Sequence, residues 1–270
     1  MIAGAEAEDL VATALDAARE AAALVEASWR KSVRADHKGP VDLVTEYDRA
    51  SEALLRDRLH ARTPYPVVGE ESGKDEGDAS GPLRWYVDPI DGTTNFVHGH
   101  PFYCVSVGLL GEGDAPVLGV VVAPSLRTEW TGIAGVRATR NGEPCRVSRV
   151  ARFVDALLAT GFPYDRHTSA DNNFDAFVAI KKRCQAVRRC GSAALDMCLV
   201  ADGTYDGYWE KKLGPWDIAA GAAIVLGAGG RISAFDGSEA RILSGAMVAS
   251  NAAIHDALVD ALTAVPPPPR

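Results

Sequence analysis

The positions of apolar residues along the chain predict a protein that alternates helices and strands. Between residues 6 and 30, apolar side chains recur at the three- and four-residue spacing of one long amphipathic helix. The same spacing predicts further helices at 49–59, 172–184, 192–201, 217–226 and 252–264. Short apolar runs predict strands at 42–45, 67–68, 103–110, 117–123, 129–133, 136–139, 155–160 and 205–210, and two more before the last helix.

Turn signals between these runs divide the chain into two halves. Asn141-Gly142 is the strongest short hairpin signal, and residues 111–114 predict a second hairpin loop. The segment 74–82 is rich in glycine and acidic residues, which is typical of a loop. We expect residues 1–150 to pack helices on an antiparallel sheet and residues 151–270 to form an α/β half. The boundary falls near 145–153, and the two halves form one compact unit.

Composition narrows the possible classes of protein. The 270 residues are 47% hydrophobic and 24% charged, which is typical of a soluble globular protein. A net charge of -8 provides no basic face for a nucleic-acid partner. Five cysteines without a C-x-x-C pair predict reduced thiols in a cytoplasmic protein. Acidic residues interrupt the N-terminal helix, which argues against a signal peptide. The sequence has no apolar run of about 18 residues that would indicate a membrane span. The tail 266–270 is expected to be a frayed end.

The segment Trp85–Phe96 carries the strongest chemical signal in the chain. Its apolar start leads into Asp88 and Asp91, whose carboxylates can face one point in space and suit a hard divalent cation. The small residues that follow leave backbone N–H groups free to meet an anion. The motif therefore predicts a metal and phosphate site at the end of a strand. The alternative is an ordinary Asp-Pro and Asp-Gly surface turn.

Three other acidic sites become candidates once a metal site is suspected. Glu70 and Glu71 follow the short strand at 67–68, Asp217 follows Pro215-Trp216, and Asp48 follows the strand at 42–45. Each has an ordinary interpretation as well. Asp217 and Asp48 could simply cap helices, and the glutamate pair could be a solvated turn.

Together these motifs resemble those of the inositol monophosphatase family, within a superfamily of metal-dependent, lithium-sensitive phosphatases. The resemblance runs from about residue 6 to residue 263 and implies a layered α-β-α-β-α sandwich, an α/β fold shared with fructose-1,6-bisphosphatase. It also implies a homodimer. The matching stretches are Asp42-Leu43-Val44-Thr45-x-x-Asp48, Gly69–Ser72, Asp88–Phe96, Gly191–Leu195 and Trp216–Gly221.

The resemblance implies two to three Mg²⁺ ions in the site. Glu70, Asp88 and the carbonyl group of Ile90 would hold the first ion. Asp88, Asp91 and Asp217 would hold the second, and Glu70 with water molecules would hold a third, weaker one. Two metals can stabilise both the attacking and the leaving oxygen of an in-line displacement.

The resemblance also assigns the catalytic and phosphate-binding groups. Gly92, Thr93 and Thr94 would offer backbone N–H groups to the phosphate. A water activated by the ions would attack directly, positioned by Glu70 and by the Thr93 hydroxyl, which Asp48 would orient. A water held near Asp217 would protonate the leaving group.

Substrate hydroxyls would meet the start of the helix at Gly191, Ser192 and Ala193, together with Asp91, Asp217 and Glu210. The ordinary alternatives are a plain helix cap for Ser192 and a surface strand end for Glu210. His37-Lys38 departs from the animal pattern of the family, so neither residue is assigned a role. His98 and His100 are expected to be loop or interface residues, because Mg²⁺ prefers oxygen.

The expected function is Mg²⁺-dependent hydrolysis of inositol monophosphates to inositol and phosphate. Thr94 stands where histidinol-phosphate enzymes often have lysine, and Glu210 suits a neutral polyol. A histidinol phosphatase, or another small-ester phosphatase of the superfamily, is the alternative. A regulatory or binding protein on the same fold is the second alternative, and a two-metal nuclease is disfavoured by the missing basic surface.

Overall fold

The protein is described by a computed structural model that covers residues 4–31, 35–37, 39, 43–74 and 81–265. Asp42, Lys38, most of the 74–82 loop and the 266–270 tail, each named in the sequence interpretation, lie outside these ranges. The helices are α1 (Gly4–Glu26), α2 (Glu46–Arg62), α3 (Thr93–Val97), α4 (Phe174–Lys181), α5 (Ala193–Ala201), α6 (Pro215–Gly227) and α7 (His255–Thr263).

Two main sheets organise the chain. The first has the order β10-β9-β8-β7-β6-β5-β3-β4, and the second has the order β12-β11-β13-β15-β14. A separate pair joins β1 (Ala35–His37) and β2 (Leu43–Thr45). The first sheet consists of β3 (Val67–Gly69), β4 (Gly73–Lys74), β5 (Arg84–Asp91), β6 (Cys104–Leu110), β7 (Pro116–Ala123), β8 (Thr128–Ile133), β9 (Arg137–Arg140) and β10 (Glu143–Pro144). The second consists of β11 (Leu157–Thr160), β12 (Ala186–Arg188), β13 (Gly207–Lys211), β14 (Arg231–Ser233) and β15 (Ala246–Ser250).

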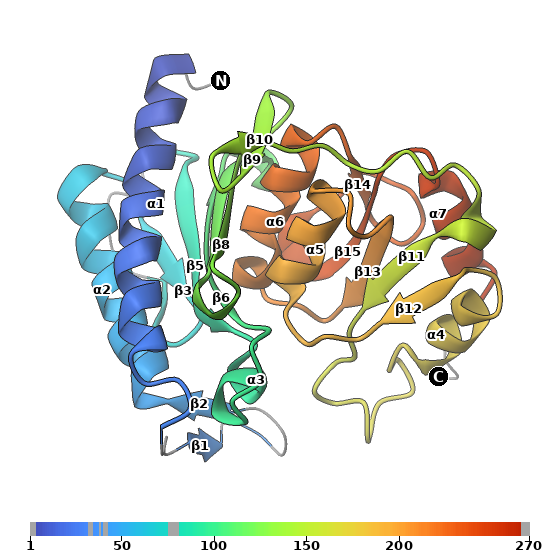
Figure 1. Cartoon of the computed structure of the whole chain (residues 1–270), viewed down its shortest axis with the longest axis horizontal. Helices are drawn as coiled ribbons and strands as arrows, with labels where there is room; N and C mark the ends of the chain where they lie inside the picture. Colours follow the sequence, from blue (N-terminus) through green and yellow to red (C-terminus); the bar gives the residue numbers. More distant parts are fainter. Residues whose placement is uncertain (1–3, 32–34, 38, 40–42, 75–80, 266–270) are drawn as a thin grey trace.

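The elements stack in five layers, as Figure 1 shows from left to right. Helices α1 and α2 cover the outer face of the first sheet, α5 and α6 lie between the two sheets, and α4 and α7 cover the far face of the second sheet. Three groups of buried apolar side chains fill the spaces between these layers. The predicted α-β-α-β-α sandwich is confirmed.

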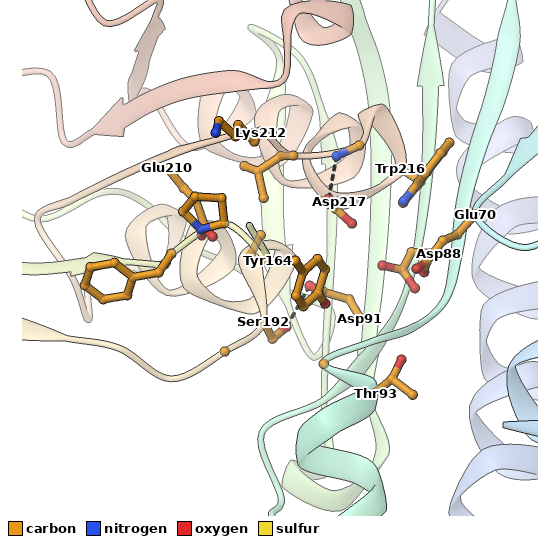
Figure 2. Close-up of a pocket in the computed structure, with 18 of the residues that line it drawn as sticks. Glu70, Asp88, Asp91, Thr93, Tyr164, Ser192, Glu210, Lys212, Trp216 and Asp217 are labelled. Atoms are coloured by element: carbon orange, nitrogen blue, oxygen red, sulfur yellow. Dashed lines mark hydrogen bonds between the residues drawn. The ribbon is translucent and has the colours of Figure 1, made fainter. Parts of the chain in front are cut away.

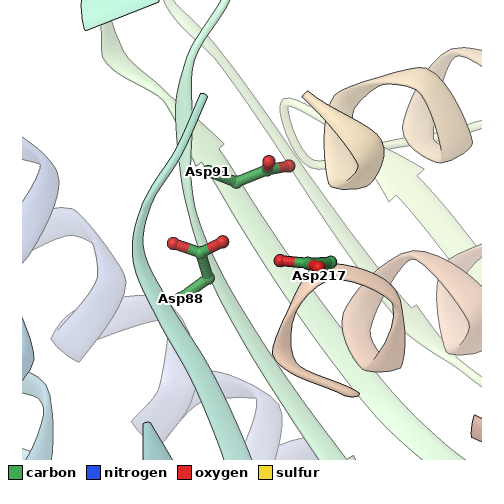
Figure 3. A group of neighbouring side chains, drawn as sticks. All are labelled: Asp88, Asp91 and Asp217. Carbon is green, nitrogen blue, oxygen red and sulfur yellow. The ribbon is translucent and has the colours of Figure 1, made fainter. Parts of the chain in front are cut away.

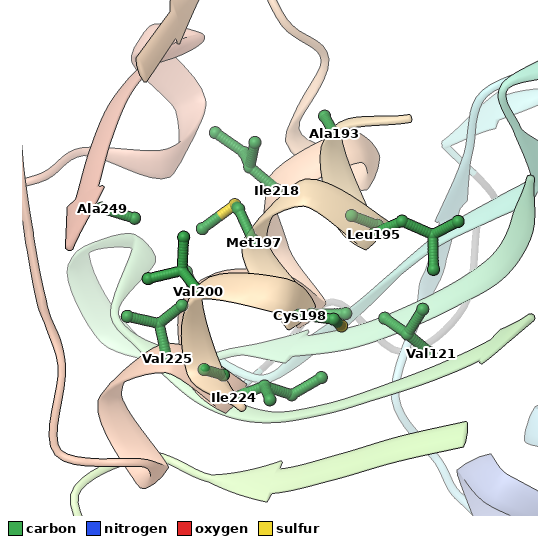
Figure 4. Close-up of a cluster of buried hydrophobic side chains, with 14 of the residues drawn as sticks. Val121, Ala193, Leu195, Met197, Cys198, Val200, Ile218, Ile224, Val225 and Ala249 are labelled. Atoms are coloured by element: carbon green, nitrogen blue, oxygen red, sulfur yellow. The ribbon is translucent and has the colours of Figure 1, made fainter. Parts of the chain in front are cut away.

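The middle layer packs on the first sheet unusually closely. Gly108, Gly119 and Gly132 are paired across β6, β7 and β8 and form a row. A Cβ atom at position 108 or 132 would lie 2.6 Å from the backbone of α6, and one at position 119 would overlap the backbone of Ala220. Glycine at these positions therefore lets α6 approach the sheet. Ile218, Ile224 and Val225 of α6 belong to the apolar cluster in Figure 4.

Several predicted elements differ from the structure at their ends. The first helix ends at Glu26 rather than at residue 30. Beyond Glu26 the backbone N–H of Ser28 donates to the carbonyl oxygen of Val25 in a turn, and Arg30 has a left-handed φ of 62°. The helix expected at 172–184 begins at Phe174, because Asn173 has a left-handed φ of 71°, and it ends at Lys181. The helix expected at 49–59 begins earlier, at Glu46, because the side chain of Thr45 caps it. The strands expected at 155–160 and 205–210 begin at Leu157 and Gly207.

The expectation of a purely antiparallel first sheet was wrong in one place. Strand β3 pairs in parallel with β5, and all other neighbours in that sheet are antiparallel. The hairpin predicted at Asn141-Gly142 is confirmed between β9 and β10, with φ values of 52° and 81° at the two residues. Helix α3 and strands β1 and β12 were not predicted; they are five, three and three residues long.

Within the described ranges, none of the helices combines the length and apolar composition needed to cross a membrane. All five cysteines belong to these ranges and carry free thiols, as the sequence predicted.

Candidate active site

Three carboxylates converge where the first sheet meets the middle helices. Asp88 and Asp91 lie at the end of β5, and Asp217 lies in the first turn of α6. Each offers a carboxylate oxygen, and these oxygens lie within 4.8 Å of one another. Figure 3 shows the three side chains pointing toward a common space.

A bulge in β5 allows two residues three positions apart to face the same way. In a regular strand such residues point to opposite faces. Here Asp88 pairs with Ser106 and Asp91 pairs with Cys104, so three steps on β5 match two on β6. The extra residue turns the strand locally, and Asp91 therefore joins Asp88 on one side.

Burial and mutual repulsion shift the ionisation of this cluster. Burial raises the pKa of Asp88 well above its usual value, and the carboxylates of Glu70, Asp91 and Asp217 raise it further. The pKa of Asp217 is raised well above its usual value by burial and by the carboxylates of Asp91, Glu70 and Glu210. Burial raises the pKa of Asp91 to about 6, while hydrogen bonds from Ser192 and Ala194 oppose this shift.

The donor set of this cluster fits a hard divalent cation. Its ligand atoms are all oxygen, and three carboxylates lie close together, with Asp88 and Asp91 buried and Asp217 half-buried. A cation there would neutralise the repulsion that raises these pKa values. Glu70 follows β3, lines the same pocket and lies close to Asp88 in Figure 2.

Glu52 holds the segment after Glu70 through hydrogen bonds, and it was not predicted from the sequence. Its carboxylate is buried and accepts hydrogen bonds from the backbone N–H groups of Glu71 (2.7 Å) and Ser72 (3.0 Å). A Cβ atom at Gly69 would overlap this carboxylate. The signal was present in the sequence, because Asp48 and Glu52 are two acids spaced four apart and so share one face of a helix.

Asp48 and Thr93 form a second hydrogen-bonded group beside the carboxylates. The Thr93 hydroxyl donates to Oδ1 of Asp48 and to the carbonyl oxygen of Ile90, both at 3.0 Å. The other oxygen of Asp48 accepts from the backbone N–H (2.7 Å) and hydroxyl (2.5 Å) of Thr45. Asp48 therefore completes the capping box of α2 with Thr45 and orients Thr93 at the same time.

The segment after Asp91 faces the start of α5. Gly92 has a φ of 95°, which favours glycine, and is the N-cap of α3. The amide of Asn95 donates to the carbonyl oxygens of Phe102 (2.7 Å) and Cys190 (2.9 Å), which ties this turn to the segment before α5. Ser192 caps α5 and donates to Asp91 at 2.7 Å.

Glu210 lies at the other end of the pocket, close to the end of β13. Tyr208 donates to its carboxylate at 2.7 Å. Burial raises the pKa of Glu210 to about 7, while the hydrogen bond from Tyr208 and the charge of Arg189 oppose this shift. Glu210 can therefore change its charge near neutral pH.

One pocket contains most of the residues that the sequence singled out. Asp48 and Thr94 are not in its lining: Asp48 lies behind Thr93, and Thr94 is exposed. The lining residues that were predicted are Glu70, Asp88, Ile90, Asp91, Gly92, Thr93, Gly191, Ser192, Ala193, Glu210 and Asp217. The lining residues that were missed are Gly161, Phe162, Pro163, Tyr164, Arg189, Lys212, Leu213, Gly214 and Trp216.

The sequence model described as the inositol monophosphatase family matches residues 6–266. The chain belongs to the inositol monophosphatase family. The resemblance noted in the motifs is thereby confirmed, and the chain is an enzyme of the phosphatase class that this family defines.

Individual relatives and solved structures are similar to this chain over nearly its whole length. An inositol-1-monophosphatase of Synechocystis is 43% identical, over 94% of this chain and 88% of the relative. The solved inositol monophosphatase of Anabaena superposes with a TM-score of 0.87 at 38% identity, covering 96% of this chain and 97% of that one. The Nus factor SuhB of Pseudomonas aeruginosa is 38% identical, over 94% of this chain and 96% of the relative.

Proposed function

We propose that this protein is a Mg²⁺-dependent phosphomonoesterase that hydrolyses inositol monophosphates to inositol and phosphate. The observation that carries the proposal is the convergence of the carboxylates of Asp88, Asp91 and Asp217 at one end of a pocket that ends at Glu210. The relative named inositol-1-monophosphatase supports the choice of substrate.

Two to three Mg²⁺ ions would be held by Glu70, Asp88, the carbonyl group of Ile90, Asp91 and Asp217. When bound, they would supply Lewis-acid chemistry that polarises the phosphate and acidifies water. The oxygen-only donor set supports Mg²⁺ over softer metals.

The remaining residues of the chain would hold the phosphate and guide the attacking water. The first turn of α3 has N–H groups without intrahelical partners, and Gly92, Thr93 and Thr94 would direct them at the phosphate. The hydroxyl of Thr93 donates to Asp48, so a lone pair can accept a hydrogen bond from the water. As the water loses a proton to Thr93, Thr93 would pass its own proton to the Asp48 carboxylate. Attack would be direct, without a covalent intermediate on the enzyme.

Glu210 and the start of α5 at Gly191, Ser192 and Ala193 would contact the hydroxyl groups of the substrate. Because Ser192 already donates to Asp91, its hydroxyl would orient that carboxylate. Thr94 and Glu210 favour a neutral polyol ester over histidinol phosphate, which is the alternative substrate. The proposal has further parts. The enzyme would be a cytoplasmic homodimer that lithium inhibits. Its two halves, 1–150 and 151–270, would meet at the active site.

The proposal is tested by phosphate release from inositol 1-phosphate and histidinol phosphate, with Mg²⁺ and with EDTA. We expect Mg²⁺-dependent release with a preference for inositol 1-phosphate. Asp88→Asn and Asp217→Asn should each lower kcat by about 10²-fold or more. The matched control is Asp9→Asn, an exposed acid on α1, which should leave activity unchanged. Full activity of folded Asp88→Asn and Asp217→Asn variants would overturn the proposal.

A second candidate function is favoured by the relative named Nus factor SuhB. Under this alternative the same fold binds a transcription complex as a regulatory protein. In cells that lack this protein, an Asp88→Asn variant without phosphatase activity that still restores normal transcription would support this alternative. Complementation that tracks phosphatase activity across the variants would argue against it.

A further inference from the structure

We propose that Tyr164 is a specificity-determining residue whose aromatic ring packs on the face of a cyclic substrate while Glu210 holds the hydroxyl groups at its edge. This inference rests on the proposed function and narrows its substrate class to phosphate esters of rigid ring polyols. Tyr164 is 58% exposed, lines the pocket and lies among the inward-facing side chains in Figure 2.

Tyr164 and Glu210 extend from the same edge of the second sheet. Strands β11 and β13 are parallel, with Thr160 paired to Trp209, so the residues that follow them emerge side by side. A Cβ atom at Gly161 would overlap the carboxylate of Glu210. The turn that carries Tyr164 is therefore in direct contact with the carboxylate expected to bind hydroxyl groups.

The base of this turn is held by a buried network. The amide of Asn173 donates to the carbonyl oxygen of Gly161 (2.7 Å) and to the hydroxyl of Thr160 (2.9 Å). The ring of Phe162 packs against those of Phe174 and Phe177, with centroids 4.9 and 5.6 Å apart. Tyr164 thus stands on a supported turn, two residues beyond an aromatic cluster.

The segment after Tyr164 is tied to the end of the strand that carries Glu210. Lys212 donates to Asp165 at 2.7 Å and to Ser169 at 2.8 Å. Lys211 is paired with Asp171 at 2.5 Å. Lys212 has a φ of 61°, a left-handed conformation that costs free energy for a residue with a side chain. Two ion pairs therefore hold the Tyr164 segment against the Glu210 strand, and they help to offset the backbone strain at Lys212.

Tyr164 and Glu210 together give this end of the pocket one apolar ring and one carboxylate, which suit a cyclic polyol. A cyclitol has C–H groups on its two faces and hydroxyl groups around its edge. The apolar body of a tyrosine suits such a face, and an ionised carboxylate accepts hydrogen bonds from the edge. A short linear polyol has no rigid face of this kind, so the tyrosine should discriminate between the two substrate classes.

The test compares kcat/KM for inositol 1-phosphate with kcat/KM for glycerol 2-phosphate, a linear ester with the same reacting group. For Tyr164→Ala we expect kcat/KM for inositol 1-phosphate to fall about five- to tenfold, mainly through KM. Glycerol 2-phosphate should change less than about twofold. Tyr164→Phe should keep the preference, because it keeps the ring.

Val136→Ala serves as the control, since it truncates a side chain that is 71% exposed and outside the pocket lining. Unfolding temperatures of all variants check that each is folded. An equal loss on both esters, no loss on either, or a Tyr164→Phe variant as weak as Tyr164→Ala would overturn the inference. A wild-type protein inactive on both esters would instead contradict the proposed function, which is a separate outcome.

Discussion

At the scale of single residues, Thr93 has a hydroxyl whose removal should affect the rate rather than binding. Thr93→Val keeps the shape of the side chain but loses the group that Asp48 orients. We expect kcat for inositol 1-phosphate to fall about 10²-fold, with KM changed less than about threefold, because the backbone N–H groups that meet the phosphate remain. Thr93→Ser should keep most of the activity. A Thr93→Val enzyme with wild-type kcat would contradict this role.

Glu210 should make the choice of substrate depend on pH. Its pKa in the folded protein is about 7, so it is ionised above that pH and becomes protonated below it. Only the ionised form accepts hydrogen bonds from substrate hydroxyls through both oxygens. The ratio of kcat/KM for inositol 1-phosphate to that for glycerol 2-phosphate should therefore fall as pH is lowered from 8 to 6.

The ratio is the informative quantity, because titration of the phosphate group affects both esters alike. Glu210→Gln should give a low ratio that does not change with pH. A ratio that stays high at pH 6, or a Glu210→Gln variant with the wild-type pH profile, would show that Glu210 does not select the substrate.

At the scale of elements, the position of α6 depends on the glycine row of the first sheet. Gly119→Ala places a methyl group where the backbone of Ala220 lies, so α6 must move away from β7. We expect the free energy of unfolding to fall by about 1–3 kcal/mol, measured by urea titration. Activity should fall as well, because α6 carries Asp217.

The matched control for this change is Gly81→Ala. A Cβ atom there would meet nothing within 4 Å, so stability should stay within about 0.5 kcal/mol of the wild type. If Gly119→Ala were as stable and active as Gly81→Ala, the close approach of α6 would not be what positions Asp217.

The sequence predicted the metal-site residues better than it predicted the structural features that orient their side chains. Asp88 and Asp91 were recognised together, but a strand with period two would separate them, and only the pairing with β6 reveals the bulge. Likewise Tyr164 carries no local signal. It enters the pocket because β11 and β13 are neighbours and because the last residue of β13, Lys211, and the next residue, Lys212, bind the following segment. Contacts between distant segments cannot be read from local periodicity.

At the scale of the whole molecule, the converging carboxylates should couple metal binding to stability. Asp88 and Asp91 from the first sheet meet Asp217 from the middle layer, so repulsion among them pushes these layers apart. A cation that binds only the folded state stabilises it by about 2.7 kcal/mol at a hundredfold excess over Kd. For a chain of this length, we expect Mg²⁺ to raise Tm by about 5–10 °C relative to EDTA.

The Asp88→Asn variant tests whether Asp88 both repels its neighbours and binds the metal. Removing one charge relieves the repulsion and also removes a metal ligand. In EDTA its Tm should therefore be equal to or higher than that of the wild type, whereas Mg²⁺ should raise it by less than about 2 °C. Asp9→Asn should respond to Mg²⁺ as the wild type does. If Asp88→Asn were strongly destabilised in EDTA, or if it kept the full Mg²⁺ shift, Asp88 would not be a repelled metal ligand that joins the two layers.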